Sequence, residues 1–364
     1  NDSAPTLAIT SGSLSCDFPT LGTAGMPFAA CTIAFSADNL SLWTNKQPNL
    51  YALEVNLSGS GVPGVLDRFI TQVGFRNFTI VDSKFELNGA PVYLAGTSIH
   101  EEWENSGRTL TTAQIFTDLS LMKNLSCNIF RSHYPMNPVY YLYADRLGLS
   151  AWQECPDYWF NEVNFIEADI SNSTWAMFLE MVYRDFDRPS IFFQGVTNEP
   201  ISEKLLVSYL QERKALLAFV DPSRILGFAG ASNYLVNPGW AVTDIVGFNC
   251  YWGLEEGVLG DYYNQARSAM ATVAKANPGK PILVTEFSPG NDTGNTMVQP
   301  FEDYVKAFEE NPAICGILYW VFADYVGYSG STQSTGVYSF DRTQERPTGP
   351  VMQALYTNLT AANP

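Results

Sequence analysis

The pattern of hydrophobic and polar positions changes character near residue 90. Before it, short stretches alternate between apolar and polar residues and are separated by Gly, Pro, Ser and Asn, without a helical period. After it, apolar runs of six to ten residues alternate with longer amphipathic stretches. The first pattern is typical of antiparallel β-structure, and the second is typical of repeated units of one strand and one helix.

Residues 1–88 are predicted to form an all-β domain. The dipeptide Asn88-Gly89, between "FEL" and "PVYLAG", predicts a two-residue hairpin turn because both residues tolerate positive φ. An immunoglobulin-like β-sandwich usually takes about 100 residues and about seven strands. Residues 1–88 are short for such a domain, so we expect an immunoglobulin-like sandwich that is incomplete.

Residues 89–364 contain eight candidate β-strands separated by helical patterns, such as the stretch in which Ile115, Leu119 and Met122 share one face. Eight such units predict a closed (β/α)8 TIM barrel. A doubly wound open sheet is the alternative, but it normally has a Gly-rich phosphate loop after its first strand, and "LAGTSIHEE" has none. The candidate strands are residues 92–99, 128–134, 149–154, 190–199, 224–230, 245–252, 281–287 and 316–324.

The composition is that of a packed globular protein. Of 364 residues, 46% are hydrophobic and only 16% are charged, the opposite of a disordered composition. The 20 basic and 37 acidic residues give a net charge of −17, which argues against nucleic acid or an anionic membrane surface as a partner. No apolar run reaches the ~18 residues of a membrane-spanning helix, so we predict no membrane span.

Eight Asn-X-Ser/Thr sequons indicate a eukaryotic secretory route and predict a surface-glycosylated protein. We therefore expect a secreted or extracellular protein, or one in a vacuolar or lysosomal lumen. The chain begins without methionine or an apolar leader, so we expect any signal peptide to be removed or to lie outside this sequence. The sequons are at Asn1, Asn39, Asn56, Asn77, Asn124, Asn172, Asn291 and Asn358.

Six cysteines are compatible with an oxidising compartment. Cys16 and Cys31 lie in the β-rich part with a Gly/Pro-rich stretch between them, which predicts a disulfide between neighbouring strands. The other four lie in or beside apolar strands, and we interpret them as small core residues, with bridged pairs as the alternative. With only two histidines and no zinc-finger spacing, no metal site is predicted. These four are Cys127, Cys155, Cys250 and Cys315.

Two predicted core strands end in a glutamate, Glu199 on the fourth strand and Glu286 on the seventh. In a closed barrel the carboxyl ends of all strands meet at one face, where the chemistry takes place. Two opposed carboxylates, one protonating a leaving oxygen and one attacking a sugar carbon, make a retaining glycosidase if about 5–5.5 Å separates them. The alternative, two merely solvated strand ends, does not explain the other polar residues at the same level.

Those residues supply hydrogen-bond donors, charges and aromatic faces, the composition that a sugar-binding pocket needs. We predict that they bind substrate around Glu199 and Glu286. They are His100, Glu101, Arg131, His133, Asn198, Asn249, Tyr251 and Trp320.

Several longer motifs carry a family resemblance. The stretches "FELNGAPVYLAGTSIHEE", "LMKNLSCNIFRSHYPMNPVYYLYADRLGLSAWQE", "RDFDRPSIFFQGVTNEP", "GFNCYWG", "PILVTEF" and "YWVFADY" occur in this order between about residues 42 and 347. In this order they resemble glycoside hydrolase family 2, which contains β-galactosidases, β-glucuronidases and β-mannosidases. The barrel is most similar to that of the β-glucuronidases.

The resemblance implies a role for each matching residue. Glu199 in "NEP" corresponds to the general acid/base, and Glu286 in "TEF" corresponds to the nucleophile. Asn198 would hold the 2-hydroxyl of the sugar, and Tyr251 would donate a hydrogen bond to the nucleophile. The residues expected to line the subsite of the terminal sugar are His100, His133 and Trp320.

The chain departs from the family pattern in two ways. β-Glucuronidases bind the substrate carboxylate with an Asn-X-Lys motif, but the matching stretch "STQSTGVYSFDR" has no lysine. A buried carboxylate without a cation is costly, so glucuronic acid is disfavoured unless Arg108, Arg342 or another basic group reaches the site. The N-terminal jelly-roll domain of the family is also absent from this chain, and we expect either that domain or a homo-oligomer as a partner.

The leading hypothesis is a retaining exo-β-glycosidase that removes a terminal β-linked sugar from an oligosaccharide or glycoconjugate, without a cofactor. A neutral sugar, with β-galactoside slightly favoured, comes first, and β-glucuronide is the alternative. The alternative of a different class is a catalytically silent secreted protein with a structural or glycan-binding role. Trp159 lies in a loop at the catalytic face, where it is a candidate for stacking on a sugar. The loop with Glu255, Glu256 and Asp261 is interpreted as a solvated acidic loop, with a calcium site as the alternative.

Overall fold

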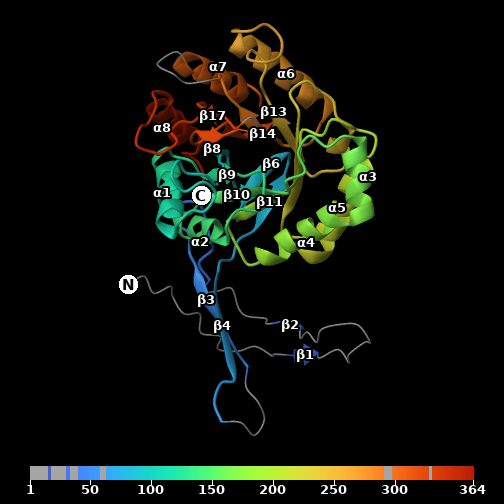
Figure 1. Cartoon of the computed structure of the whole chain (residues 1–364), viewed down its shortest axis with the longest axis vertical. Coiled ribbons are helices and arrows are strands. Elements are labelled where there is room, and N and C mark those ends of the chain that lie inside the picture. The colour runs from blue at the N-terminus through green and yellow to red at the C-terminus, as the bar shows by residue number, and fades with distance from the viewer. Residues whose placement is uncertain (1–14, 18–29, 33–39, 58–62, 291–296, 328–329) are drawn as a thin grey trace.

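The computed structural model describes residues 15–17, 30–32, 40–57, 63–290, 297–327 and 330–364. Eight parallel strands close into a barrel surrounded by helices, and a two-stranded ribbon extends away from it (Figure 1). Neighbours around the barrel follow chain order from β8 to β15, and β15 pairs with β8. The TIM barrel predicted from the sequence is therefore confirmed.

Each barrel strand overlaps one of the predicted strands. Both faces of each strand are buried, because helices cover the outside of the barrel and side chains fill its inside. Most of the strand residues are therefore apolar. The strands are β8 (Leu94–Ser98), β9 (Ile129–Arg131), β10 (Ser150–Glu154), β11 (Ile191–Asn198), β12 (Ile225–Gly230), β13 (Val246–Asn249), β14 (Ile282–Phe287) and β15 (Ile314–Tyr319).

Local sequence signals mark the start of some of the outer helices. The first one starts with a capping box between Thr111 and Gln114, and its Ile115, Leu119 and Met122 face the core. A short 3-10 helix, η1 (Pro238–Ala241), stands between β12 and β13. The α-helices are α1 (Thr112–Asn124), α2 (Pro138–Leu147), α3 (Glu162–Ser171), α4 (Ser173–Arg184), α5 (Leu206–Val220), α6 (Tyr262–Ala276), α7 (Val298–Glu309) and α8 (Thr348–Leu359).

A three-stranded sheet closes the amino-terminal end of the barrel. It consists of β5 (Phe78–Val81), β6 (Lys84–Leu87) and β7 (Ala90–Pro91). Phe78 stacks on Phe192 with ring centroids 4.0 Å apart, and Phe85 packs edge-on against Phe193.

The turn between β6 and β7 is the hairpin predicted from the sequence. Leu87 pairs with Ala90, and the two residues between them, Asn88 and Gly89, have φ angles of 55° and 81°. Two positive φ angles in succession are what a two-residue turn of this kind requires.

We expect Phe85→Ala to lower the free energy of unfolding by about 3–5 kcal/mol, because a fully buried ring is replaced by a cavity. Val81→Ala is the matched control on the same three-stranded sheet. Its side chain is 42% exposed, so its effect should stay within about 0.5 kcal/mol. Chemical denaturation of both variants measures the difference, and equal effects would show that this sheet does not seal the core.

The ribbon formed by β3 (Tyr51–Leu57) and β4 (Asp67–Val73) has one apolar face. Val55 lies opposite Phe69 in the antiparallel register, and both side chains are exposed. Arg188 joins the base of the ribbon to the barrel through a 2.6 Å hydrogen bond to the carbonyl of Gln72.

The immunoglobulin-like sandwich predicted for residues 1–88 is not seen in the described part of the chain. The pair β1 (Ser15–Asp17) and β2 (Ala30–Thr32), the ribbon, and the sheet β5–β7 are three separate small sheets. A sandwich needs two sheets that face each other across a shared core, whereas the ribbon leaves its apolar face exposed. The domain boundary at residue 88 stays a prediction.

The structure bears on two further sequence predictions. β1 and β2 pair with Cys16 opposite Cys31 in the register, and the disulfide between them stays a prediction. The core interpretation of the other cysteines is confirmed, since all four are buried free thiols. Within the described residues, no helix is both long enough and apolar enough to cross a membrane.

Five of the sequon asparagines are exposed, as glycosylation would require. Asn1, Asn39 and Asn291 lie outside the described residues, and the glycosylation itself stays a prediction. The exposed ones are Asn56, Asn77, Asn124, Asn172 and Asn358.

Candidate active site

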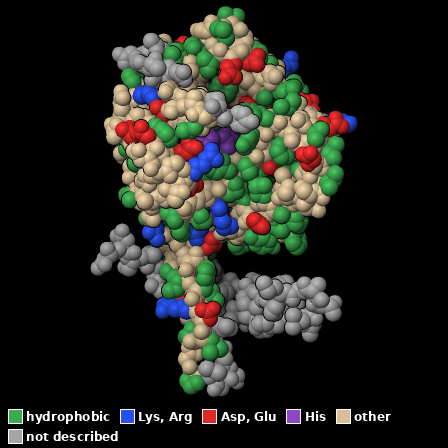
Figure 2. All heavy atoms as spheres, viewed as in Figure 1, with side chains coloured by type: hydrophobic (Ala, Val, Ile, Leu, Met, Phe, Trp, Pro, Cys, Tyr) green, Lys and Arg blue, Asp and Glu red, His purple; other side chains and the backbone are tan. Residues whose placement is uncertain are grey.

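Both predicted catalytic glutamates lie at the carboxyl ends of barrel strands. Glu199 directly follows β11, and Glu286 is the last residue but one of β14. The register of β13 and β14 places Asn249 opposite Glu286. In Figure 2, the histidine side chains lie in a hollow of the barrel, with acidic and basic side chains beside it.

The carboxylate of Glu286 has a donor on each oxygen. Oε1 accepts a hydrogen bond from Arg131 Nη1 at 2.6 Å, and His133 Nε2 lies 3.5 Å from the same atom. Oε2 accepts a hydrogen bond from Tyr251 Oη at 2.6 Å. Because Glu286 is only 5% exposed, these bonds are not weakened by bulk water, and they fix the orientation of the carboxylate.

Arg131 is the centre of a buried polar network. Its guanidinium donates to Glu154 Oε1 at 3.0 Å and to Asn198 Oδ1 at 2.8 Å, besides its bond to Glu286. Trp152 Nε1 completes the network with a 2.8 Å bond to Glu154 Oε2. The sequence predicted Arg131 as a substrate-binding residue, but its side chain is completely enclosed by protein. We therefore propose that it positions Glu286 and Asn198 instead.

Glu199 is held by two donors from different segments. Oε1 accepts a hydrogen bond from Asn249 Nδ2 at 2.8 Å, and Oε2 accepts one from Trp159 Nε1 at 3.0 Å. Thr285 Oγ1 donates to Asn249 Oδ1 at 2.7 Å and so orients that amide. The backbone of Glu199 has a φ of 47°, a strained conformation for a residue other than Gly that is common at functional sites.

The environment of Glu199 favours its protonated form. Burial raises the pKa of Glu199, and the negative charge of Glu286 raises it further. The hydrogen bonds from Asn249 and Trp159 act in the opposite direction but do not cancel these effects. The raised pKa suits Glu199 to donate a proton, whereas the ion pair with Arg131 holds Glu286 in place.

Aromatic side chains form one wall of the site. His133 and Trp320 have ring centroids 4.9 Å apart, and His100 packs edge-on against Trp320 at 5.4 Å. Tyr325, in β16 (Tyr325–Val326), stacks on His100 at 4.2 Å. Burial lowers the pKa of His100 well below its usual value, and nearby positive charges lower it further, so this imidazole is neutral at neutral pH.

Two residues considered for this site serve other contacts. Glu101 accepts a hydrogen bond from the backbone of Asn137 at 2.8 Å, at the start of α2, so its carboxylate is engaged there. Arg342 is buried, with its Nε 2.9 Å from Asp118 Oδ1, so it does not reach a substrate carboxylate.

Arg108 differs from Arg342 because its side chain is 68% exposed. Its Nε donates to Glu102 Oε1 at 3.0 Å, and its guanidinium lies 5.9 Å from the ring centroid of Tyr134. Tyr134 Oη lies 3.4 Å from His100 Nδ1. Arg108 therefore lies at the edge of the aromatic wall.

Three residues of the site were not among the predicted site residues. Glu154 ends the third barrel strand, so the strand-end rule that selected Glu199 could also have selected it. Trp159 and Tyr325 come from segments between or after the barrel strands, where no periodic signal exists. Among the described residues, no group of three or more His, Cys, Asp or Glu could hold a metal ion.

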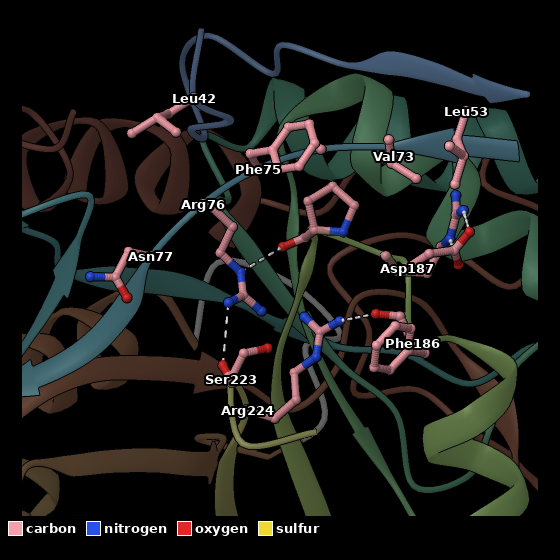
Figure 3. A pocket seen from close by; sticks show the side chains of 13 residues that line it. Leu42, Leu53, Val73, Phe75, Arg76, Asn77, Phe186, Asp187, Ser223 and Arg224 are labelled. Carbon is pink, nitrogen blue, oxygen red and sulfur yellow. Dashed lines mark hydrogen bonds and ion pairs between the residues drawn. The ribbon is translucent and has the colours of Figure 1, made fainter. Parts of the chain in front are cut away.

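A second cavity, of about 450 Å³, lies at the opposite end of the barrel (Figure 3). It is lined by residues just before β11 and β12, and by residues of the β3–β4 ribbon and of the segments before and after it. Arg76 Nη1 donates to the carbonyl of Ser223 at 3.2 Å, and Arg224 Nη2 donates to that of Phe186 at 2.9 Å. Since chemistry in barrels of this type occurs at the carboxyl ends of the strands, this cavity is not the candidate active site.

Comparison with known proteins places the chain in a family. Residues 78–341 match the family model described as "Glycosyl hydrolases family 2, TIM barrel domain". The human β-glucuronidase is 28% identical over 305 residues, which cover 79% of this chain and 47% of that protein. A β-galactosidase of the bacterium Photobacterium profundum is 27% identical over 293 residues, covering 78% of this chain and 26% of that protein. The chain thus spans about half, or less, of the length of these curated relatives.

Solved structures agree with this placement. A β-glucuronidase from Ruminococcus gnavus, in complex with D-glucaro-d-lactam, is 25% identical with a TM-score of 0.80, covering 90% of this chain and 59% of that chain. A family 2 β-galacturonidase from Eisenbergiella tayi, bound to galacturonate, has a TM-score of 0.81 and is 20% identical, covering 95% of this chain and 66% of that chain. At this identity the likeness supports the fold alone. The match to the family model spans most of the chain and includes both strand-end glutamates, and the chain therefore belongs to glycosyl hydrolase family 2.

Proposed function

We propose that this chain carries the active site of a retaining exo-β-glycosidase, with Glu286 as nucleophile and Glu199 as general acid/base. The observation that carries the proposal is the contrast between the two carboxylates. Glu286 forms an ion pair with Arg131 and accepts a hydrogen bond from Tyr251, which hold it in place, whereas burial and the charge of Glu286 favour protonated Glu199.

The reaction then takes two displacements at the anomeric carbon. In the first, a Glu286 oxygen forms a bond to this carbon while the bond to the glycosidic oxygen breaks and Glu199 gives its proton to that oxygen. In the second, Glu199 takes a proton from water, the water oxygen attacks the same carbon, and Glu286 is released. Asn198 uses its Oδ1 to accept from Arg131, which leaves its Nδ2 as a donor for a sugar hydroxyl.

The bound sugar is proposed to be neutral, with β-galactoside favoured. The stretch 332–336, where glucuronidases of this family have their lysine, contains no basic residue. Arg131 and Arg342 are engaged by buried carboxylates, so neither of these two cations is free to offset the desolvation of a buried uronate.

β-Glucuronidase is the second candidate, and two observations favour it. The human and Ruminococcus gnavus relatives are both named β-glucuronidases. Arg108 lies at the edge of the aromatic wall, and its guanidinium is largely exposed.

Hydrolysis of 4-nitrophenyl β-D-galactoside and β-D-glucuronide distinguishes the two candidates. We expect kcat/KM to favour the galactoside by about tenfold or more, since a pocket rejects a group whose polar contacts it cannot satisfy. A preference for the glucuronide that Arg108→Gln removes would establish the alternative instead. If folded protein hydrolyses neither substrate nor any other β-glycoside, the result would favour a catalytically silent protein with a structural or glycan-binding role.

The raised pKa of Glu199 predicts how kcat/KM depends on pH. The acid is active only while protonated, so kcat/KM should fall as pH rises through this pKa. Trp159→Phe removes a hydrogen bond that lowers the pKa, and the alkaline limb of the profile should therefore move to higher pH. Tyr158→Phe, a change in the adjacent exposed aromatic residue, is the control. An alkaline limb that stays in place in Trp159→Phe would show that this bond does not tune Glu199.

A further inference from the structure

A cavity of about 290 Å³ opens directly beside Glu199. Trp159 forms one wall, and its indole is 49% exposed while its Nε1 donates to Glu199 Oε2. Tyr234 lines the same cavity, and the acidic pair Glu255 and Glu256 lines the wall formed by the loop after β13. Because Glu199 is proposed to protonate the leaving oxygen, the cavity lies where the departing group of the substrate would be held.

The two acidic residues of this wall have no partner within the described residues. Neither carboxylate has a hydrogen-bond donor or a cation within bonding distance, and no Lys or Arg is among the described residues that line the cavity. Glu255 is exposed and Glu256 is partly buried. Burial and the charges of Glu256 and Glu286 raise the pKa of Glu255. The cavity therefore presents unneutralised negative charge to any group that enters it.

The loop that carries the acidic pair is fixed to the catalytic residues. The backbone amides of Glu255 and Glu256 donate to the carbonyl of Tyr251 at 2.8 and 3.3 Å. The amide of Gly253 donates to the carbonyl of Glu256, and Gly253 has a φ of 97°, which suits a tight turn. Tyr251 also binds the nucleophile, so the acidic pair keeps a defined position relative to the reaction centre.

We propose that this cavity is the leaving-group subsite and that Glu255 and Glu256 make it selective for a cationic aglycone, such as an amino sugar or a ring that carries an ammonium group. The exposed face of Trp159 provides the surface on which such a ring stacks. The carboxylates attract the ammonium group and repel an anionic aglycone. This inference rests on the proposed glycosidase function and specifies the class of substrate.

The test uses three aryl β-glycosides of the sugar that the substrate comparison identifies. Their phenols carry an aminomethyl, a hydroxymethyl or a carboxymethyl group at the 4-position, so that the aglycone is cationic, neutral or anionic at pH 7. The methylene group insulates the phenol, which keeps leaving-group reactivity similar. We expect kcat/KM to fall from cationic to neutral to anionic, with about tenfold between the extremes at low ionic strength and less in salt.

In the double variant E255Q/E256Q, kcat/KM should no longer fall from the cationic to the neutral to the anionic aglycone. Glu167→Gln, which removes one negative charge from the exposed surface of α3, should retain it. Equal kcat/KM for all three glycosides, or an order that survives in E255Q/E256Q, would overturn the inference and leave the glycosidase function intact. Absence of hydrolysis with every sugar would instead overturn the proposed function, and the inference with it.

Discussion

Glu286→Ala is expected to abolish measurable hydrolysis, because no other described side chain lies in place to form the covalent bond to the sugar. Glu199→Gln should reduce kcat by about 10²–10⁴-fold, the usual contribution of a general acid/base. Tyr209→Phe is a suitable control, since its hydroxyl bonds Asp157 away from both glutamates. Steady-state kinetics with an activated aryl glycoside measures all three variants. Full activity in Glu286→Ala would contradict the assignment.

Rescue by azide separates the two roles. In Glu286→Ala, azide can occupy the space of the missing carboxylate and attack the anomeric carbon opposite a good leaving group. The carbon–oxygen bond breaks, the phenolate leaves with the electron pair, and an α-glycosyl azide forms. In Glu199→Ala the covalent intermediate still forms, and azide attacks it from the other face to give the β-glycosyl azide. The reverse stereochemistry would exchange the roles of the two residues.

Arg131→Met is expected to lower the free energy of unfolding by about 3–5 kcal/mol, because it leaves the buried carboxylates of Glu154 and Glu286 without their cation. Activity should also be lost, since the bonds that position Glu286 and Asn198 are lost. Chemical denaturation and kinetics measure the two effects. Arg184→Met, which removes a partly exposed arginine beside Asp185, is the control and should cost less.

The destabilisation by Arg131→Met should depend on pH. Burial acts to raise the pKa of Glu154, but the charge of Arg131 and the hydrogen bonds from His133 and Trp152 outweigh it and lower the pKa. A lowered carboxylate pKa stabilises the fold above the usual Glu pKa, and this stabilisation is lost as pH falls through the lowered value. The difference between wild type and variant should therefore be largest near neutral pH and shrink in acid.

A double variant separates stability from catalysis. Combining Arg131→Met with Glu154→Gln removes one of the two uncompensated charges, so part of the lost free energy of unfolding should return. Activity should not return, because Glu286 still lacks its strongest donor. A double variant as unstable as Arg131→Met alone would show that the ion pair with Glu154 is not the cause of the destabilisation.

The sequence alone determined the barrel and the face of it at which the two strand-end glutamates lie. The apolar runs that become β8–β15 are readable because a fully buried strand needs apolar residues on both faces. Glu199 and Glu286 could then be placed on one face, since parallel strands of a closed barrel end together. The hairpin at Asn88-Gly89 was predictable because the tolerance of positive φ is a property of the residue types Asn and Gly themselves.

Only the tertiary structure decided which partners these side chains meet. Arg131 binds Glu154 and Glu286, which lie 23 and 155 positions away, and no local pattern shows that such an arginine is enclosed instead of facing substrate. Trp159 and Tyr325 enter the site from loops whose paths depend on packing. The apolar ribbon of β3 and β4 looked like part of a sandwich because its alternation is that of a half-buried sheet. The local period of apolar residues decides where helices and strands form. Which side chains are buried, which charges pair and which sheets face each other depend on contacts between residues far apart in the chain.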